Sequence, residues 1–383
     1  FICKGLNNAV SIHCKKSWLS TGHFYICEDN IYKLRSESVR FTYIIIRGVY
    51  YMEQYYPDWN IFGVPDNQHD AFRRRLNRIL VQGRQKVNIR KQKSFGKAIL
   101  SHVKGIDVEF SNEPQQKGTY GQVAHGTYNG EQVVVKRLLQ SNEASTFILE
   151  AIIQIILHNY TEAEDCAMRV PIVYAFGRCK FPRIVTRFGS VGTETGTETI
   201  SAMGLVMQEI DGNLISTYNR VTLETHLTTV IDGLEQLQTD LSFVHRDLHA
   251  DNIIIRDNTP YIIDFGMACI GTPRKIVQNY FVFTTGCTNK SHDVCCLIVN
   301  LATYWNKKKL QPIAKKICDA YKKEVTESPS NEFDKNKTFY FKGHHWKDDI
   351  FHWFYVTLLE GIQLDKYVPE KLLRNKIVCR LRF

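Results

Sequence analysis

The feature that most constrains this chain is a compact polar motif in its second half. Residues Val244-His-Arg-Asp-Leu-His-Ala-Asp-Asn252 are followed, twelve residues after Asn252, by Asp264-Phe-Gly266. The apolar run Tyr261-Ile-Ile263, directly before Asp264, is typical of a strand. Seven specified residues at this spacing arise by chance about once in 10⁹ starting points. The motif therefore indicates a functional site, and the fold has to bring its polar residues together.

The side chains of this motif are those that phosphoryl transfer requires. The reaction needs a carboxylate beside the attacking hydroxyl and oxygen ligands for Mg²⁺ on the phosphates of ATP. Asp247 suits the first, catalytic role, and Asn252 and Asp264 suit the second as metal ligands. Gly266 is expected to allow the sharp turn after Asp264. We therefore predict a site for ATP and Mg²⁺.

A glycine-rich stretch farther upstream is typical of a loop that covers phosphates. Lys117-Gly-Thr-Tyr-Gly-Gln-Val123 lies between two strand-like runs. Glycine lets the backbone approach a phosphate closely, and an aromatic side chain within the loop can lie over it. The nucleotide-binding residues predicted in this stretch are Gly118, Tyr120, Gly121 and Val123.

The next candidate is a lysine on the following strand. Lys136 ends the run Val133-Val-Val-Lys136, fifteen residues after Gly121, and from there it can reach the α and β phosphates. Glu150, on the helix that follows, would hold Lys136 through an ion pair. Glu143 is the rival partner, but a carboxylate in the first helical turn is explained by the helix dipole. We therefore prefer Glu150.

With these motifs in this order, residues 106–383 resemble the eukaryotic-type protein kinases. The style of the motifs is most similar to the serine/threonine protein kinases of large cytoplasmic DNA viruses. The resemblance implies an α+β, two-lobed fold, with a β-rich N-lobe at 106–210 and a helical C-lobe at 211–383. An aromatic-rich region at 1–70 and a basic segment at 71–105 would precede the lobes.

The same resemblance assigns roles to residues outside the motifs above. Val206-Met-Gln-Glu-Ile210 looks like the hinge between the lobes, with Met207 as gatekeeper. Backbone groups of Gln208 and Ile210 would then bind adenine. Asp293 fits the family's aspartate that holds the catalytic loop from behind. Reduced thiols are expected for the scattered cysteines, and the location implied is the host cytoplasm, with the virion added if the protein is viral.

Because of three departures from the family pattern, the sequence does not determine which class of molecule accepts the phosphate. Gln116 replaces the first glycine of the loop, and His249 replaces the usual lysine two residues after Asp247. No Ala-Pro-Glu motif stands between Asp264 and Asp293. The first interpretation is a serine/threonine protein kinase acting on protein substrates. A lipid or small-molecule kinase is the second, and a catalytically silent structural or nucleic-acid-binding virion protein is the third.

The basic segment carries most of the chain's charge. Between Ala71 and Ile106 there are eleven lysines and arginines and no acidic residue, whereas the whole chain has a net charge of +10. Phe72, Leu76, Ile79 and Leu80 stand at helical spacing, and Gly83 and Gly96 are expected to interrupt the helix. Residues 71–106 would form either a solvated face or clamp on the lobes, or a contact with nucleic acid or an anionic membrane.

The remaining patterns predict individual elements. Asn129-Gly130 predicts a tight hairpin, and a helix is expected from Ser141 or Asn142 to His158. Residues 171–176 and 205–210 read as strands, with a low-complexity loop at 192–199 between them. No apolar stretch approaches the length of about 18 residues that a transmembrane helix needs.

Overall fold

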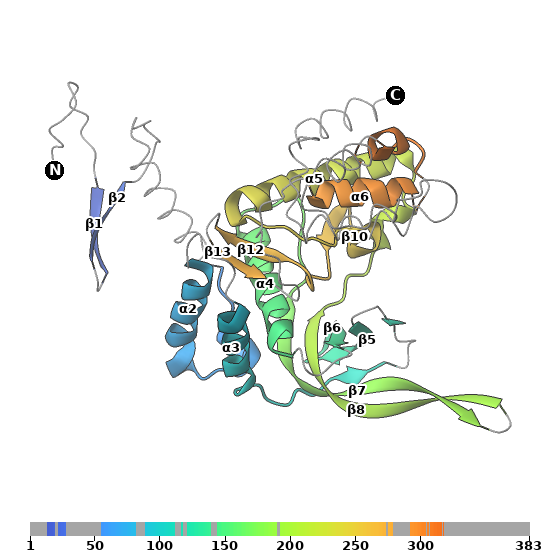
Figure 1. Ribbon diagram of the computed structural model, residues 1–383, viewed down its shortest axis with the longest axis horizontal. Coiled ribbons are helices and arrows are strands. Elements are labelled where there is room, and N and C mark those ends of the chain that lie inside the picture. The colour runs from blue at the N-terminus through green and yellow to red at the C-terminus, as the bar shows by residue number, and fades with distance from the viewer. Residues whose placement is uncertain are drawn as a thin grey trace, which may run out of the picture. The chain divides into compact units, whose positions relative to one another are not determined.

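The computed structural model describes residues 14–19, 22–27, 55–81, 89–111, 116–117, 121–138, 144–189, 192–272, 275–278, 292–303, 305, 307–315 and 317. The chain divides into two compact units, residues 1–47 and 48–383. In the first unit, β1 (Cys14–Leu19) and β2 (Gly22–Cys27) pair as an antiparallel hairpin. The elements described below belong to the second unit (Figure 1).

The second unit is built on an antiparallel sheet of six strands in the order β3-β5-β6-β8-β7, with β4 paired to β5. The strands are β3 (Glu109–Phe110), β4 (Gln116–Lys117), β5 (Gly121–Tyr128), β6 (Glu131–Leu138), β7 (Val173–Gly189) and β8 (Gly192–Gln208). Central β6 buries Val133 and Val135 completely. Together with the helices described below, this sheet confirms the predicted α+β class.

The predicted hairpin at Asn129-Gly130 is confirmed. Tyr128 pairs with Glu131 across the turn, and both turn residues have positive φ, 52° at Asn129 and 85° at Gly130. Asparagine and glycine tolerate this left-handed backbone better than other residues, which is why this dipeptide makes such a turn. The hairpin aligns β5 and β6 so that Val123 stands opposite Lys136.

The expectation of a loop at 192–199 is wrong. Strands β7 and β8 continue as one long antiparallel hairpin in which Gly189 pairs with Gly192, and Figure 1 shows this twisted ribbon extending beyond the rest of the sheet. Threonine occupies every second position from 193 to 199. Because threonine is β-branched, this alternation favours a strand, and the low complexity of the sequence hid it.

Three helices and a short 3₁₀ turn lie beside the sheet: η1 (Trp59–Phe62), α2 (Asp66–Val81), α3 (Ile89–Leu100) and α4 (Ala144–Ala163). The predicted amphipathic helix is present as α2, where Phe72 and Leu76 are buried. Gly96 does not interrupt a helix but lies within α3. A Cβ atom there would stand 2.1 Å from the carbonyl oxygen of Ser145 in α4. Gly96 therefore marks the point where α3 and α4 touch.

Helix α4 runs five residues past the predicted end at His158. Its isoleucines at 148, 152, 155 and 156 are all buried, which confirms the predicted apolar face. The expected cap at Ser141 or Asn142 and the rival carboxylate Glu143 fall outside the described residues, as does Gly83.

The second half of the unit is mostly helical. Its elements are β9 (Asn213–Leu214), η3 (Ile215–Thr217), α5 (Arg220–Leu241), η4 (Ala250–Asn252), β10 (Ile253–Arg256), β11 (Thr259–Ile262), β12 (Cys269–Thr272), β13 (Lys275–Gln278) and α6 (His292–Thr303). Strands β9, β10 and β11 form a small antiparallel sheet that carries the polar motif at its ends. The side chain of Asn219 caps α5 by accepting a hydrogen bond from the backbone N–H of Thr222.

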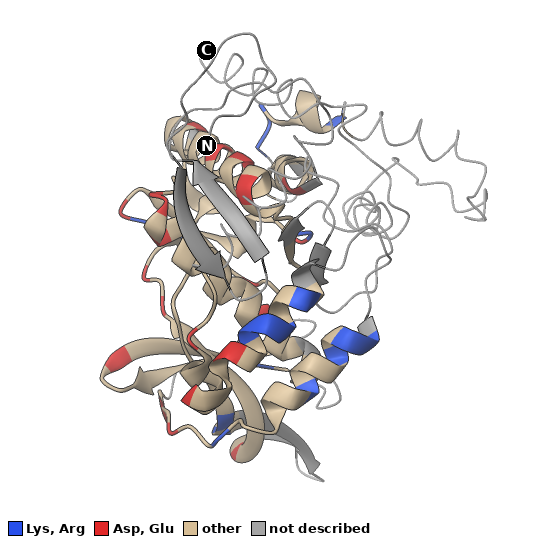
Figure 2. Ribbon diagram, turned by 90° about the vertical axis from the view of Figure 1, so that its left-hand side faces the viewer, with Lys and Arg blue, Asp and Glu red and all other residues tan. Residues whose placement is uncertain are grey.

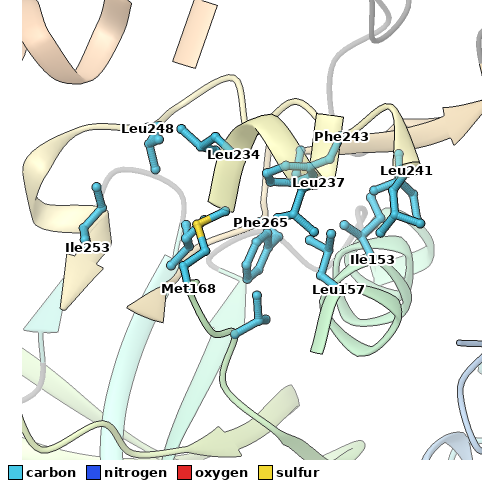
Figure 3. Close-up of a cluster of buried hydrophobic side chains, with 14 of the residues drawn as sticks. Ile153, Leu157, Met168, Leu234, Leu237, Leu241, Phe243, Leu248, Ile253 and Phe265 are labelled. Atoms are coloured by element: carbon cyan, nitrogen blue, oxygen red, sulfur yellow. The ribbon is translucent and has the colours of Figure 1, made fainter. Parts of the chain in front are cut away.

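One hydrophobic core extends from Tyr55 to Ile317. Figure 3 shows part of it, where Phe265 points in among Leu157, Leu237 and Phe243. Phe265 is fully buried, and its ring centroid lies 6.3 Å from that of Phe243. Because Phe265 follows Asp264 directly, the core anchors the backbone that carries this aspartate.

Two sequence expectations can be compared with the described residues. Cys166, Cys179, Cys295 and Cys296 are free and buried, but Cys269 is disulfide-bonded, so the expectation of reduced thiols is wrong at that position. Within the described part of the chain, no helix is both long enough and apolar enough to cross a bilayer.

Candidate active site

The centre of the site is an ion-paired lysine. The Nζ atom of Lys136 lies 2.6 Å from Glu150 Oε1 and 2.7 Å from Asp264 Oδ1. Lys136 comes from β6 and Glu150 from α4, and Asp264 comes from the turn after β11. The predicted Lys136–Glu150 pair is therefore present, and a residue more than a hundred positions downstream joins it.

Burial and charge act against each other in this triad. Burial raises the pKa of Glu150 from its ordinary value of 4.5 to about 7, although Lys136 opposes the rise. Burial alone would also raise the pKa of Asp264, but the ammonium of Lys136 lowers it to about 2. Burial would lower the pKa of Lys136, yet the two carboxylates hold it above its ordinary value. The lysine thus stays charged, and Asp264 stays ionised at neutral pH.

The turn after β11 is shaped by Asp264 itself. Its backbone is left-handed, with φ 63°, whereas Gly266 does not have positive φ. Asp264, and not Gly266, is therefore the residue with left-handed backbone at this turn. Gly266 instead donates its N–H to Asp264 Oδ1 at 3.2 Å, and a Cβ atom there would lie 3.2 Å from the same oxygen. The missing side chain leaves room for the carboxylate.

The loop between α5 and β10 holds Asp247 and Asn252 together. The side-chain amide of Asn252 donates to the carbonyl of Asp247 at 2.8 Å. The backbone carbonyl of Asn252 accepts a hydrogen bond from Ile263 N at 3.1 Å. Since Ile263 immediately precedes Asp264, this bond brings the two predicted metal ligands to neighbouring positions.

Helix α6 supports this loop from behind, as the family resemblance implied for Asp293. One carboxylate oxygen of Asp293 accepts from His245 N and the other from Arg246 N, each at 2.8 Å. Asp293 is fully buried, and Arg246 has left-handed backbone, with φ 70°. Two charge-assisted bonds therefore hold the strained residue directly before Asp247.

Asn300, one further residue of α6, was missed by sequence reasoning. Its Oδ1 accepts from Ala250 N at 2.9 Å. Asn300 lies seven residues after Asp293, which is two helical turns, so both side chains project from the same face of α6. A helix with polar residues seven apart in an otherwise apolar run is the signal that could have identified it.

His249 lies within this loop. Its Nε2 atom is 3.1 Å from the Asn252 side-chain nitrogen, and its Nδ1 atom is 3.7 Å from an Asp251 carboxylate oxygen. Because an amide N–H donates, His249 accepts at Nε2. The histidine therefore orients Asn252.

The glycine-rich stretch is only partly described. Gly118 and Tyr120 fall outside the described residues. On either side of them, Gln116 pairs with Val123, and Lys117 pairs with Gln122. The strands that flank this stretch are thus joined directly beside Lys136.

The predicted hinge, residues 206–210, begins in the last three residues of β8. Met207 is buried, and the side-chain nitrogen of Gln154 lies 3.7 Å from its sulfur. The backbone N–H of Gln208 already donates to Ile172 O at 2.8 Å. The predicted hydrogen bond from this N–H to adenine would have to replace the bond to Ile172.

A contact between the sheet and the predicted hinge was not foreseen. His125 Nδ1 on β5 lies 2.8 Å from Glu209 Oε1, which links the sheet to the hinge. Each side chain is about a quarter exposed, at 23% and 29%. No sequence signal points to this pair, because the two residues are 84 positions apart.

The donor set fits a magnesium ion held on phosphates. The amide nitrogen of Asn252 is engaged, which leaves Oδ1 as its metal-binding atom, and the Asp264 side chain is 45% exposed. In the described residues, no group of three or more His, Cys, Asp or Glu could hold a metal by itself. Mg²⁺ commonly takes one or two protein ligands and completes its shell with phosphates and water.

Comparison with known families agrees with this chemistry. Residues 208–274 match the model of the phosphotransferase enzyme family, and this range contains the loop of Asp247 and Asn252 as well as Asp264. No match to a curated protein was found. The matched family is defined by phosphotransfer, and its description names no acceptor. In this segment, the chain is therefore similar to the phosphotransferase enzyme family.

Proposed function

We propose that the protein is an ATP- and Mg²⁺-dependent serine/threonine protein kinase. The observation that carries the proposal is the triad of Lys136 with Glu150 and Asp264, beside the loop that holds Asp247 and Asn252. Removing a lysine and a carboxylate from water costs free energy that their mutual attraction repays only in part, so a functional role would explain why the triad is present. In the proposed architecture, the sheet with α4 is one lobe and the helical half is the other.

Each residue of the site has a distinct role in this proposal. Lys136 binds the α and β phosphates, and Glu150 positions Lys136. Asp264 and Asn252 hold Mg²⁺, which neutralises charge on the phosphates when bound. Asp247 orients the acceptor hydroxyl and takes its proton. Gly118, Tyr120, Gly121 and Val123 line the phosphates, while Met207, Gln208 and Ile210 contact adenine.

A lipid or small-molecule acceptor is the second candidate. His249 occupies the position where protein kinases usually have lysine, and it is bonded to Asn252. A lysine there would place a cation near the transferred phosphate, whereas this chain has a histidine at that position. The sequence between Asp264 and Asp293 also has no Ala-Pro-Glu motif for peptide docking. Both observations favour an acceptor other than an extended peptide.

Transfer of labelled phosphate from ATP tests the proposal. The protein, Asp264→Asn and the control Asp257→Asn are compared on a basic protein, on lipid vesicles and on small hydroxylated molecules. Asp257 is 90% exposed in the turn between β10 and β11. We expect label on serine and threonine of the protein, reduced at least about 100-fold in Asp264→Asn and unchanged in the control.

The other outcomes distinguish the alternatives. Label only on lipid or on a small molecule supports the second candidate and excludes the first. If no acceptor is labelled and Mg-ATP does not bind, the site is a catalytically silent scaffold and the proposal fails.

A further inference from the structure

The outward side of α2 and α3 carries a dense set of cations, which we call the basic face. Figure 2 shows these lysines and arginines gathered on two neighbouring helices. The exposed members are Arg73, Arg74, Arg78, Arg90, Lys91, Lys93 and Lys97. No acidic residue occurs from 71 to 106, although Asp70, earlier on α2, lies 3.6 Å from the guanidinium of Arg73.

The opposite sides of both helices are used by the core. Phe72, Leu76, Phe95 and Ile99 are buried, and α3 touches α4 at Gly96. The guanidinium of Arg75 is turned to Ser94, with hydrogen bonds of 3.0 and 3.1 Å, and lies 5.7 Å from the Phe95 ring centroid. These contacts show that the other sides of the two helices are packed, so the basic face is their solvent-exposed side.

The positions of the cations suit a row of phosphates. Arg74 and Arg78 stand one turn apart on α2, and Arg90, Lys93 and Lys97 follow at intervals of three and four on α3. A turn rises about 5.4 Å, so each helix offers a cation on successive turns of one side. Arginine can bind a phosphate through two parallel hydrogen bonds.

The side chains around these cations distinguish between polyanions. Helices that lie on membranes insert apolar side chains below the headgroups. In the described part of the chain, the exposed large apolar side chains are Val221 and Trp305, and neither lies on α2 or α3. Single strands are bound by stacking on aromatic rings, but Phe72 and Phe95 are buried. These observations disfavour a membrane and a single strand, and they favour a ligand that is recognised through its phosphates alone.

We propose that the basic face binds the phosphate backbone of a nucleic acid duplex without reading its bases. Release of counterions from the duplex supplies the free energy of such binding. The proposal does not depend on phosphotransfer, because the basic face lies on elements that contribute none of the proposed catalytic residues.

Fluorescence anisotropy with a labelled duplex of about 30 base pairs, from about 50 to 200 mM salt, tests this proposal. The full chain is compared with the triple variant Arg74→Gln, Lys93→Gln, Lys97→Gln. The control, Lys180→Gln, Lys308→Gln, Lys315→Gln, removes the same charge from exposed positions elsewhere. The same assay on Asp264→Asn separates binding from catalysis.

We expect the logarithm of the affinity to fall with the logarithm of salt with a slope of about −4 to −6. The triple variant should lower the size of that slope by about 2 to 3 and weaken binding at least about tenfold, whereas the control stays within about twofold. If the triple variant unfolds, Lys93→Gln and Lys97→Gln singly should each lower the slope by about 1.

Several results would overturn the proposal. These are absence of duplex binding at low salt, an equal loss in both triple variants, and tighter binding to a single strand than to the duplex. Preferential binding to phosphatidylserine vesicles would assign the basic face to a membrane instead.

Discussion

At the scale of single residues, Glu150 links the electrostatics of the site to pH. Its pKa is raised from 4.5 to about 7 by burial, whereas Asp264, at about 2, is ionised throughout the neutral range. Between pH 4.5 and about 7, the folded protein therefore takes up a proton at Glu150 that the unfolded chain does not bind. This group makes the free energy of unfolding fall as pH rises through that window, and above about 7 its effect is constant.

Activity should change in the opposite direction. Only ionised Glu150 can pair with Lys136, so we expect kcat/KM for ATP to rise with pH through about 7. Glu150→Gln should lower kcat/KM by about 10- to 100-fold, which is the loss of one charge-assisted hydrogen bond. The pH profiles of kcat/KM are measured for the wild type and for Glu150→Gln from about pH 5.5 to 8.5. Because the ionisation of ATP affects both profiles equally, it cancels in their ratio. A ratio that does not change with pH would contradict this role for Glu150.

Much of the candidate site could be predicted residue by residue. Lys136, Glu150 and Asp264 were identified by spacing, because phosphate chemistry restricts which residue types stand at those positions. The left-handed backbone at Asp264 could not be read, since a nearby glycine is the usual signal for such a turn. Asn300 and the His125–Glu209 pair were also missed, because each depends on a contact between elements distant in sequence.

At the scale of elements, a local pattern predicts the structure correctly where it has a single physical cause. Asn129-Gly130 predicts its hairpin because both residues accept positive φ. The segment 192–199 predicts a loop because a run of threonine, glutamate and glycine looks like a linker, although its alternation fits a strand. Gly96 was read as a helix breaker, whereas the contact with α4 explains why glycine stands there.

The crossing of α3 and α4 gives a sharp prediction about Gly96. In Gly96→Ala, the new Cβ would meet the backbone oxygen of Ser145 at 2.1 Å, so the two helices must separate. We expect a loss of about 1 to 3 kcal/mol in the free energy of unfolding, measured by urea denaturation. Helix α4 carries Glu150, so kcat/KM for ATP should fall as well.

The control for this prediction is Gly196→Ala in β8. A Cβ atom at Gly196 would have no neighbour within 4 Å. We therefore expect a change within about 0.5 kcal/mol. Equal effects of the two substitutions would show that α3 and α4 do not touch at Gly96.

At the scale of the whole molecule, the segment before the sheet shares the core of the candidate site. Tyr55 packs edge-on against Tyr160 with ring centroids 5.2 Å apart, and its hydroxyl donates to Glu164 at 2.5 Å. Phe62 lies 5.7 Å from Phe176, between centroids. No sequence motif predicts these contacts. An aromatic residue predicts its own burial, but it does not indicate which residues it will pack against.

This shared core predicts what two truncations would do. A chain that begins at residue 106 loses nine buried apolar side chains: Tyr55, Tyr56, Trp59, Phe62, Val64, Phe72, Leu76, Phe95 and Ile99. At about 1.5 to 3 kcal/mol each, the loss is about 10 kcal/mol or more, which is comparable to the whole stability of a typical domain. We expect no cooperative thermal transition from that chain by calorimetry.

A chain that begins at residue 48 keeps the second unit whole, so its Tm should stay within about 3 °C of the full chain. The chain that begins at residue 106 could instead melt cooperatively near the Tm of the full chain and transfer phosphate. In that case residues 55–104 are dispensable for the catalytic fold, and the basic face belongs to an appended module.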